Sequence, residues 1–263
     1  RADGMLDYRA GIHVPFGGKR DETYVIATSD LTGMTLDLPA PLTKSDVNTH
    51  RDFEYRQYFQ DNGFRVDMSL GDDIKASLKI EDGIAVGGRI HFGSDSFGAV
   101  TFDRIRMTGR LAQLDYEQWM LVTDQLAELT DVSLEDEIAA YVASVELSVD
   151  ELLLFSLPLE DASVRVTRGD QAWLAHIDNQ MLLGDIKVAD DDLQPIAVDL
   201  RRISFDEEEG EGDPLAAIDP LEIGDIDFAT EHLLIDGENY GGWAFQYRAK
   251  DDMARFENLS ANA

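Results

Sequence analysis

Apolar and polar residues alternate along most of the first 113 positions of the chain. Between residues 64 and 70 every second residue is apolar, and neighbouring runs repeat this period. Such alternation predicts β-strands with one dry and one solvated face. The expected strands lie at 24–27, 34–38, 64–70, 74–80, 84–92, 100–102 and 105–111.

Short turn signals separate these runs. The dipeptide Asp82-Gly83 stands between two alternating runs and is a strong hairpin signal. Consecutive hairpins favour an antiparallel meander over parallel strand–helix–strand units. The run at 34–38 ends at Pro39-Ala40-Pro41, because proline has no N–H to donate to a strand ladder.

The period of the apolar residues changes after residue 114. Trp119, Val122, Leu126 and Leu129 follow helical spacing and predict a helix at about 115–129. A second helix is expected at 133–144, after a break at Thr130-Asp131. Together these residues predict a short two-helix insert in a mainly β protein.

Strand patterns resume after the insert. Expected strands lie at 147–155, 162–167, 172–178, 181–188, 196–205, 223–228, 232–235, 243–247 and 255–259. Residues 149–162 and 232–243 share a pattern of strand, tight turn and strand, which predicts a repeated β unit. The expected division is a β unit at 1–113, a helical insert at 114–145, a second β unit at 146–209 and a partial third unit at 210–263.

Composition narrows the class of partners. The 263 residues include 53 acidic and 22 basic ones, and the formal charge is −31. This charge argues against binding nucleic acid and against docking on anionic lipid headgroups. The chain has no cysteine, so disulfides and thiolate metal sites are excluded. No apolar run approaches the roughly 18 residues of a membrane-spanning helix, and we expect any anchor to lie in a longer chain outside these residues.

The sequence contains no familiar catalytic or cofactor motif. The five histidines are isolated from one another, and the acidic run at 206–213 lacks the spacing of a calcium loop. Trp173 and Trp243 fit sugar-stacking platforms or core aromatics, and the core interpretation is favoured. We therefore expect no enzyme activity, no catalytic residues, no metal and no cofactor.

Four segments carry a resemblance to a known family. Residues 29–44, SDLTGMTLDLPAPLTK, resemble the SDL.G..LDLPAPLGK segment of the YhdP-type proteins of the AsmA-like superfamily, with Thr43 in place of the family's glycine. The other three segments are 105–119, 149–155 and 241–259, in the family's order. The first segment is the most specific of the four.

The resemblance implies a fold and a function. Members are periplasmic proteins anchored in the inner membrane, built of repeated β units with one concave apolar face, and implicated in moving phospholipids to the outer membrane and in its permeability barrier. It therefore implies a curved, groove-like sheet, with phospholipid acyl chains, the rest of the same polypeptide and membrane proteins of both membranes as partners. No catalytic group is required.

One set of apolar side chains is expected to line the groove. Alternation places its members on a common side of the sheet, because a one-residue slip would put them all in water. They are Met34, Leu36, Leu38, Val66, Met68, Leu70, Val86, Ile90 and Phe92. Two alternatives remain open: a rigid β-sandwich spacer whose core is filled by its own side chains, and an envelope carbohydrate-binding module or hydrolase.

Overall fold

The computed structural model describes residues 1–15, 22–130, 140–154, 157–191, 193–205, 224–250 and 253–262. The expectation of a mainly β protein is confirmed. The chain forms two compact units. Unit 1 comprises Arg1–Leu114 with Gln118–Leu147, and unit 2 comprises Asp115–Glu117 with Ser148–Ala263. The four-part division expected from the sequence stays a prediction.

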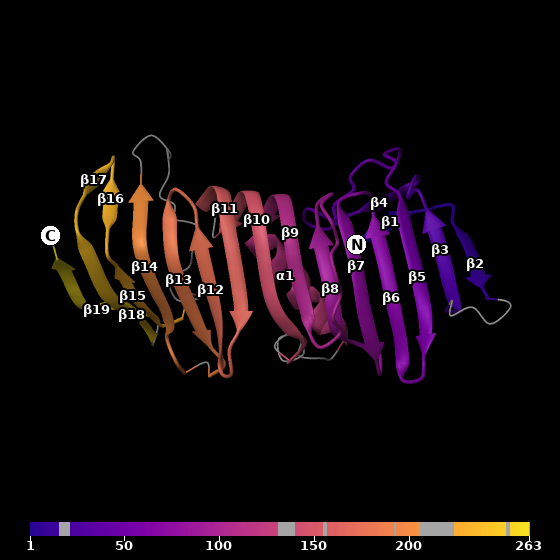
Figure 1. The fold of residues 1–263 in the computed structure, drawn as a ribbon. Helices are drawn as coiled ribbons and strands as arrows, with labels where there is room; N and C mark the ends of the chain where they lie inside the picture. Colours follow the sequence, from indigo (N-terminus) through magenta and orange to yellow (C-terminus); the bar gives the residue numbers. More distant parts are fainter. Residues whose placement is uncertain are drawn as a thin grey trace. The chain divides into compact units, whose positions relative to one another are not determined.

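Unit 1 is built on one large sheet and a small one. The small sheet pairs β1 with β4, and the large one has the strand order β2-β3-β5-β6-β7-β8-β9. Figure 1 shows β5 to β8 side by side. The strands are β1 (Ala2–Gly4), β2 (Arg9–His13), β3 (Tyr24–Ser29), β4 (Met34–Leu36), β5 (Phe53–Gln60), β6 (Gly63–Leu70), β7 (Ile74–Glu81), β8 (Ile84–Phe92) and β9 (Ile105–Asp115).

The middle of this sheet follows the expected hairpins. Asp82 and Gly83 connect β7 to β8 with positive φ angles of 51° and 86°. Both central residues of a type I′ turn need positive φ, which is why Asp-Gly is favoured there. The strand β5, which the sequence analysis did not predict, pairs antiparallel with both β3 and β6.

The expected antiparallel meander is interrupted at the end of unit 1. Strands β8 and β9 are parallel, with Gly88 opposite Ile105 and Phe92 opposite Gly109. The chain must therefore return from the end of β8 to the start of β9 through residues 93–104. Residues 100–102, expected as a strand, belong to this connection and are irregular, because they cross the sheet instead of joining its ladder.

One α-helix, α1 (Tyr116–Thr130), stands among the described residues. It matches the first expected helix. Most of the second, expected at 133–144, falls on residues 133–139, which lie outside the described residues. Ala140 and Tyr141 are helical, but a two-helix insert is not confirmed. Residues 142–144 are strand, because β10 (Val142–Leu154) begins there.

Unit 2 contains a mixed sheet. Strand β11 pairs with β12, then β13 and β14, all antiparallel, and β14 runs parallel to both β15 and β16. Strand β15 pairs with β18, and β18 pairs with β19, whereas β16 pairs with β17. The strands are β11 (Leu157–Arg168), β12 (Ala172–Asp178), β13 (Leu182–Ala189), β14 (Ile196–Phe205), β15 (Ile226–Thr230), β16 (Leu233–Ile235), β17 (Glu238–Asn239), β18 (Gly242–Lys250) and β19 (Met253–Asn262).

Candidate functional site

The large sheet of unit 1 has two chemically different faces. Its register sets Val66 opposite Leu78 and Met68 opposite Ala76, so apolar side chains form rows across the strands. The residues between them are polar or charged and share the other face. We call the first the apolar face of unit 1, formed by Phe53, Tyr55, Val66, Met68, Leu70, Ile74, Ala76, Leu78, Ile90 and Phe92.

Five of the nine expected groove residues lie on this face. They differ in burial: Val66 is 5% exposed, whereas the other four are half-buried. The five are Val66, Met68, Leu70, Ile90 and Phe92. Whether any of them contacts lipid stays a prediction.

Met34 and Leu36 lie outside the large sheet, contrary to the expectation that they extend the meander. Their strand, β4, pairs only with β1 among the named strands, and Leu38 lies beyond its end. Both side chains nevertheless meet the apolar face at a cavity of about 400 Å³. Its lining comprises Leu6, Tyr8, Ala27, Thr28, Ser29, Leu31, Met34, Leu36, Phe53 and Leu70.

A β-bulge displaces Val86 from its expected place. The register between β7 and β8 shifts so that Lys79 faces Gly87 whereas Ile80 faces Ala85. Val86 is therefore the extra residue without a cross-strand partner. Ile80 lies in register with the apolar face, so the shift brings Ala85 to that face as well. Simple alternation from Ile90 and Phe92 would have placed Ala85 on the polar face.

Hydrogen bonds to backbone carbonyls hold the segment at 29–51 in place. The Lys44 side chain is buried, and its ammonium donates to the carbonyls of Met34 and Asp46, each at 2.7 Å. Gly33 has a positive φ of 91°, and its N–H donates to the carbonyl of Val47 at 2.7 Å. The segment that most resembles a known family thus has a structural role in supporting β4.

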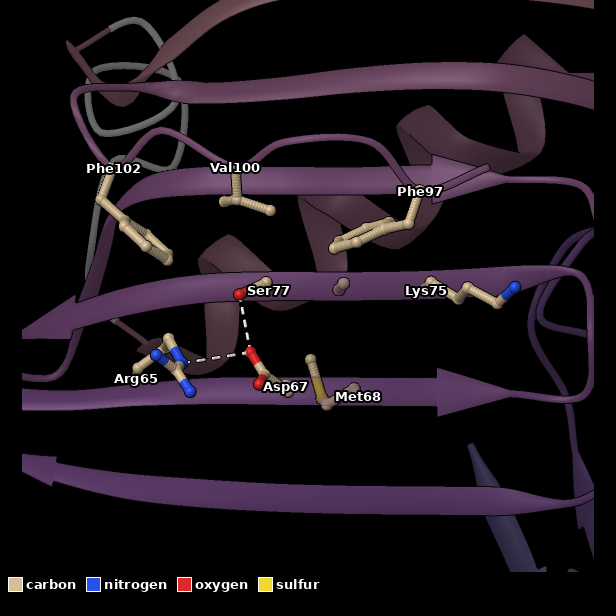
Figure 2. Close-up of a pocket in the computed structure, with 9 residues that line it drawn as sticks. Arg65, Asp67, Met68, Lys75, Ser77, Phe97, Val100 and Phe102 are labelled. Atoms are coloured by element: carbon tan, nitrogen blue, oxygen red, sulfur yellow. Dashed lines mark hydrogen bonds and ion pairs between the residues drawn. The ribbon is translucent and has the colours of Figure 1, made fainter. Parts of the chain in front are cut away.

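Helix α1 and this segment lie against one another. The indole Nε1 of Trp119 donates to the carbonyl of Ala40 at 2.8 Å. Figure 2 looks onto the polar face of unit 1, and α1 lies behind the strands, on the side of the apolar face. The apolar face of unit 1 is thus partly covered by elements of its own unit.

One polar pair interrupts the apolar face of unit 1. The Tyr55 hydroxyl donates to Oε1 of Gln57 at 2.8 Å, and both residues belong to the same face of β5. Burial raises the pKa of the Tyr55 phenol, because removal from water disfavours the phenolate. The pair therefore stays neutral at physiological pH.

Unit 2 also has an apolar face. Its central row takes one residue from each of six strands: Val166, Ala175, Ile186, Val198, Phe228 and Phe245. These side chains are half-buried, whereas the flanking Asp185, Lys187 and Asp199 are exposed. The strands of unit 2 that the structure describes all belong to one sheet.

Aromatic rings close one end of this face. The rings of Phe228 and Phe245 are stacked, with centroids 4.7 Å apart. Phe256 meets Phe245 and Tyr247 edge to face at 5.3 Å and 5.4 Å. Such pairs stabilise the packing beyond the area that they bury. Trp243, considered above as a sugar platform, instead donates its Nε1–H to the carbonyl of Tyr240.

The histidines and carboxylates form no metal centre in the part of the chain that the structure describes. No group of three or more such side chains there could hold an ion. His50 lies near two aspartates, Asp30 and Asp52, whereas His176 contacts Asp185. His91 lies 3.1 Å from the Thr108 hydroxyl. The acidic run at 206–213 lies outside the described residues. Among the described helices, none is long and apolar enough to cross a membrane.

Comparison with known proteins gives one match. A family model described as YhdP protein matches residues 1–263. No curated protein matches the chain, and no solved structure matches it.

Proposed function

The chain belongs to the YhdP family, and from this premise we propose that it carries phospholipid acyl chains along its apolar faces, toward the outer membrane. The observation that supports this most directly is the apolar row of unit 2. Its six side chains are only half-buried, and no charged residue interrupts the row. An apolar face of this extent marks an interaction site.

The length of the row suits an acyl chain. Neighbouring strands lie about 4.8 Å apart, so the five steps from Val166 to Phe245 span about 24 Å. One leaflet of a bilayer is about 15 Å thick in its hydrocarbon part, half of the roughly 30 Å core. Each methylene moved out of water contributes about 0.8 kcal/mol, so ten methylenes along the row contribute about 8 kcal/mol.

The charged residues that flank the row leave its apolar face free of charge. Asp185, Lys187 and Asp199 are exposed on the opposite face. A lipid whose chains follow the apolar row can therefore keep its headgroup in water at the strand ends, which avoids the cost of burying a charge. This mode of transport uses no catalytic group and no cofactor. We place the chain in the periplasm as part of a longer inner-membrane-anchored polypeptide, with proteins of both membranes as partners.

Site-specific photocrosslinking in living cells tests the proposal. A photoreactive amino acid at Ile186 or Val198 should capture phospholipid, identified by mass spectrometry of the adduct. Placed at Asp185 or Asp199, one residue away on the exposed face, it should capture little. Equal capture from both faces, or none from either, would refute a lipid path along this row.

A substitution separates the lipid path from a rigid spacer. In the lipid-path model Ile186→Asp costs only about 1 kcal/mol of folding free energy, because a surface change of this kind is usually mild. In the spacer model the same carboxylate is buried and costs about 3 kcal/mol or more. The control is Lys187→Asp on the exposed face. A folded Ile186→Asp protein that no longer captures lipid supports the proposal, and an unfolded one favours the spacer.

A further inference from the structure

The polar face of unit 1 carries a hollow, to whose lining Met68 and Ala76 of the apolar face also contribute. Figure 2 shows the hollow beneath the connection between β8 and β9. Its volume is about 440 Å³. The residues that line it are Arg65, Asp67, Met68, Lys75, Ala76 and Ser77 from β6 and β7, with Phe97, Val100 and Phe102 from the connection.

Two kinds of chemistry face one another across this hollow. The floor presents ionic and hydroxyl groups, because Arg65, Asp67 and Ser77 alternate with residues of the apolar face. The roof presents two phenyl rings, Phe97 and Phe102, which point toward the strands in Figure 2. A molecule that fills the space must therefore be apolar on one side and polar on the other.

The roof is held away from the floor by fixed contacts. Nη1 of Arg89 donates to the carbonyl of Phe97 at 2.8 Å, and Nη1 of Arg106 donates to Oγ1 of Thr101 at 2.7 Å. At Gly87 a Cβ atom would lie 2.4 Å from the carbonyl oxygen of Phe102, so the two backbones touch there. The connection is thus pinned at both ends and cannot fill the hollow by sinking into it.

The charges on the floor leave one cation available. Asp67 accepts a hydrogen bond from the Ser77 hydroxyl at 2.6 Å and lies 3.4 Å from Nε of Arg65. Arg65 also pairs with Glu22 at 3.1 Å. Lys75, in contrast, has no hydrogen-bond or ion-pair partner among the described residues. An anionic group would find its one unoccupied counter-charge at Lys75.

We propose that this hollow binds a single-chain anionic amphiphile, with its carboxylate or phosphate at Lys75 and its apolar body beneath Phe97 and Phe102. At roughly 30 Å³ for a group of the size of a water molecule, 440 Å³ holds about fifteen methylene-sized groups. A diacyl phospholipid is too large. The ligand class is a free fatty acid or a short alkyl phosphate, and the site lies on the polar face of unit 1.

Calorimetry with three matched probes tests the chemistry. Decanoate and decyl phosphate, each below its micellar concentration, are titrated into the 263-residue chain, with decanol as the uncharged probe. We expect one of the two anions to bind with a stoichiometry of one and to weaken as salt is added. The preferred head distinguishes a carboxylate source from a phosphate source. Equal affinity for decanol, or no binding of either anion, would overturn the proposal.

Two variants locate the site. Lys75→Gln removes the counter-charge and Phe97→Ala removes part of the roof, and each should weaken binding about tenfold. Lys79→Gln is the matched control, because Lys79 lies on the same strand and face, outside the hollow, and pairs with Glu81. Unchanged affinity in both test variants would show that the anion binds elsewhere.

A photoreactive decanoate maps the contact directly. Trypsin releases residues 90–104 as one peptide, which contains the whole roof of the hollow. Labelling of this peptide that is lost in Lys75→Gln supports the site. Labelling confined to β12–β14 would instead assign the probe to the apolar row of unit 2 and overturn the inference. Because the two regions give different peptides, the outcome is independent of the proposed transport function.

Discussion

Replacement of Lys44, the buried lysine of the 29–51 segment, should lower the local stability of β4 and leave that of unit 2 unchanged. Lys44 is only 4% exposed, and its ammonium donates to two carbonyls at 2.7 Å and approaches a third, that of Val47, at 3.5 Å. The test variant is Lys44→Met, which keeps much of the side-chain volume. Lys187→Met, at an exposed position of β13, is the matched control.

The expected magnitude follows from these contacts. A hydrogen bond from a charged donor contributes about 1.5–3 kcal/mol, so the two short bonds contribute about 3–6 kcal/mol before any cost is subtracted. Burial of an ammonium costs several kcal/mol, and methionine avoids that cost. The net loss of local stability should therefore be about 2–3 kcal/mol.

Hydrogen exchange of backbone amides measures this loss where it occurs. The amide of Gly33 bonds to Val47 and that of Leu36 bonds to Lys44, so both report on the segment. A loss of 2–3 kcal/mol should speed their exchange about 30- to 150-fold. Amides of unit 2, such as that of Ala175, should be unaffected. Exchange within threefold of the unmodified protein at both reporters would refute the supporting role of the ammonium.

Two further predictions concern the strands around the crossover connection. Gly88→Ala should lower the free energy of unfolding, measured with denaturant, by about 2–4 kcal/mol, because φ is 137° and the new Cβ would lie 2.1 Å from the carbonyl oxygen of Ser77. Gly83→Ala, which has open space around it, should lower this free energy less. Equal losses in the two variants would contradict the steric argument. The Arg106 guanidinium holds the pKa of Asp103 well below its usual range, so this pair stabilises the fold at neutral pH and is lost only as the pH falls through the lowered pKa. Arg106→Gln should return the pKa of Asp103 toward about 4 in an NMR titration, and an unchanged value would contradict this cause.

Local patterns predicted the parts of the fold that local contacts build. The runs at 64–70, 74–80 and 84–92 became β6, β7 and β8, because each is joined to the next by a tight turn. Strand β5 was missed because aromatic residues occupy both of its faces: Tyr55 lies on the apolar face and Tyr58 on the other. An apolar-versus-polar count cannot distinguish the two faces in such a run.

Long-range pairing determined the parts that alternation could not predict. Val100 and Phe102 are spaced by two, as in a strand, yet the parallel pairing of β8 with β9 makes their segment a crossover. The bulge beside Val86 adds one residue to β8, and the only sequence signal for it is the glycine pair Gly87-Gly88 inside the strand pattern. The hollow beneath Phe97 depends on both features, so only the structure could locate it.

The divided pairing of β14 bears on how the chain stays dispersed. Its first half pairs with β15, whereas its second half pairs with β16. Strand β16 in turn pairs with β17, which has two exposed residues, Glu238 and Asn239. A short, charged edge is a poor template for aggregation, because another chain gains few hydrogen bonds there and meets a like charge. In a protein of net charge −31, the carboxylate of Glu238 adds to the repulsion that another copy of the chain would meet at this edge.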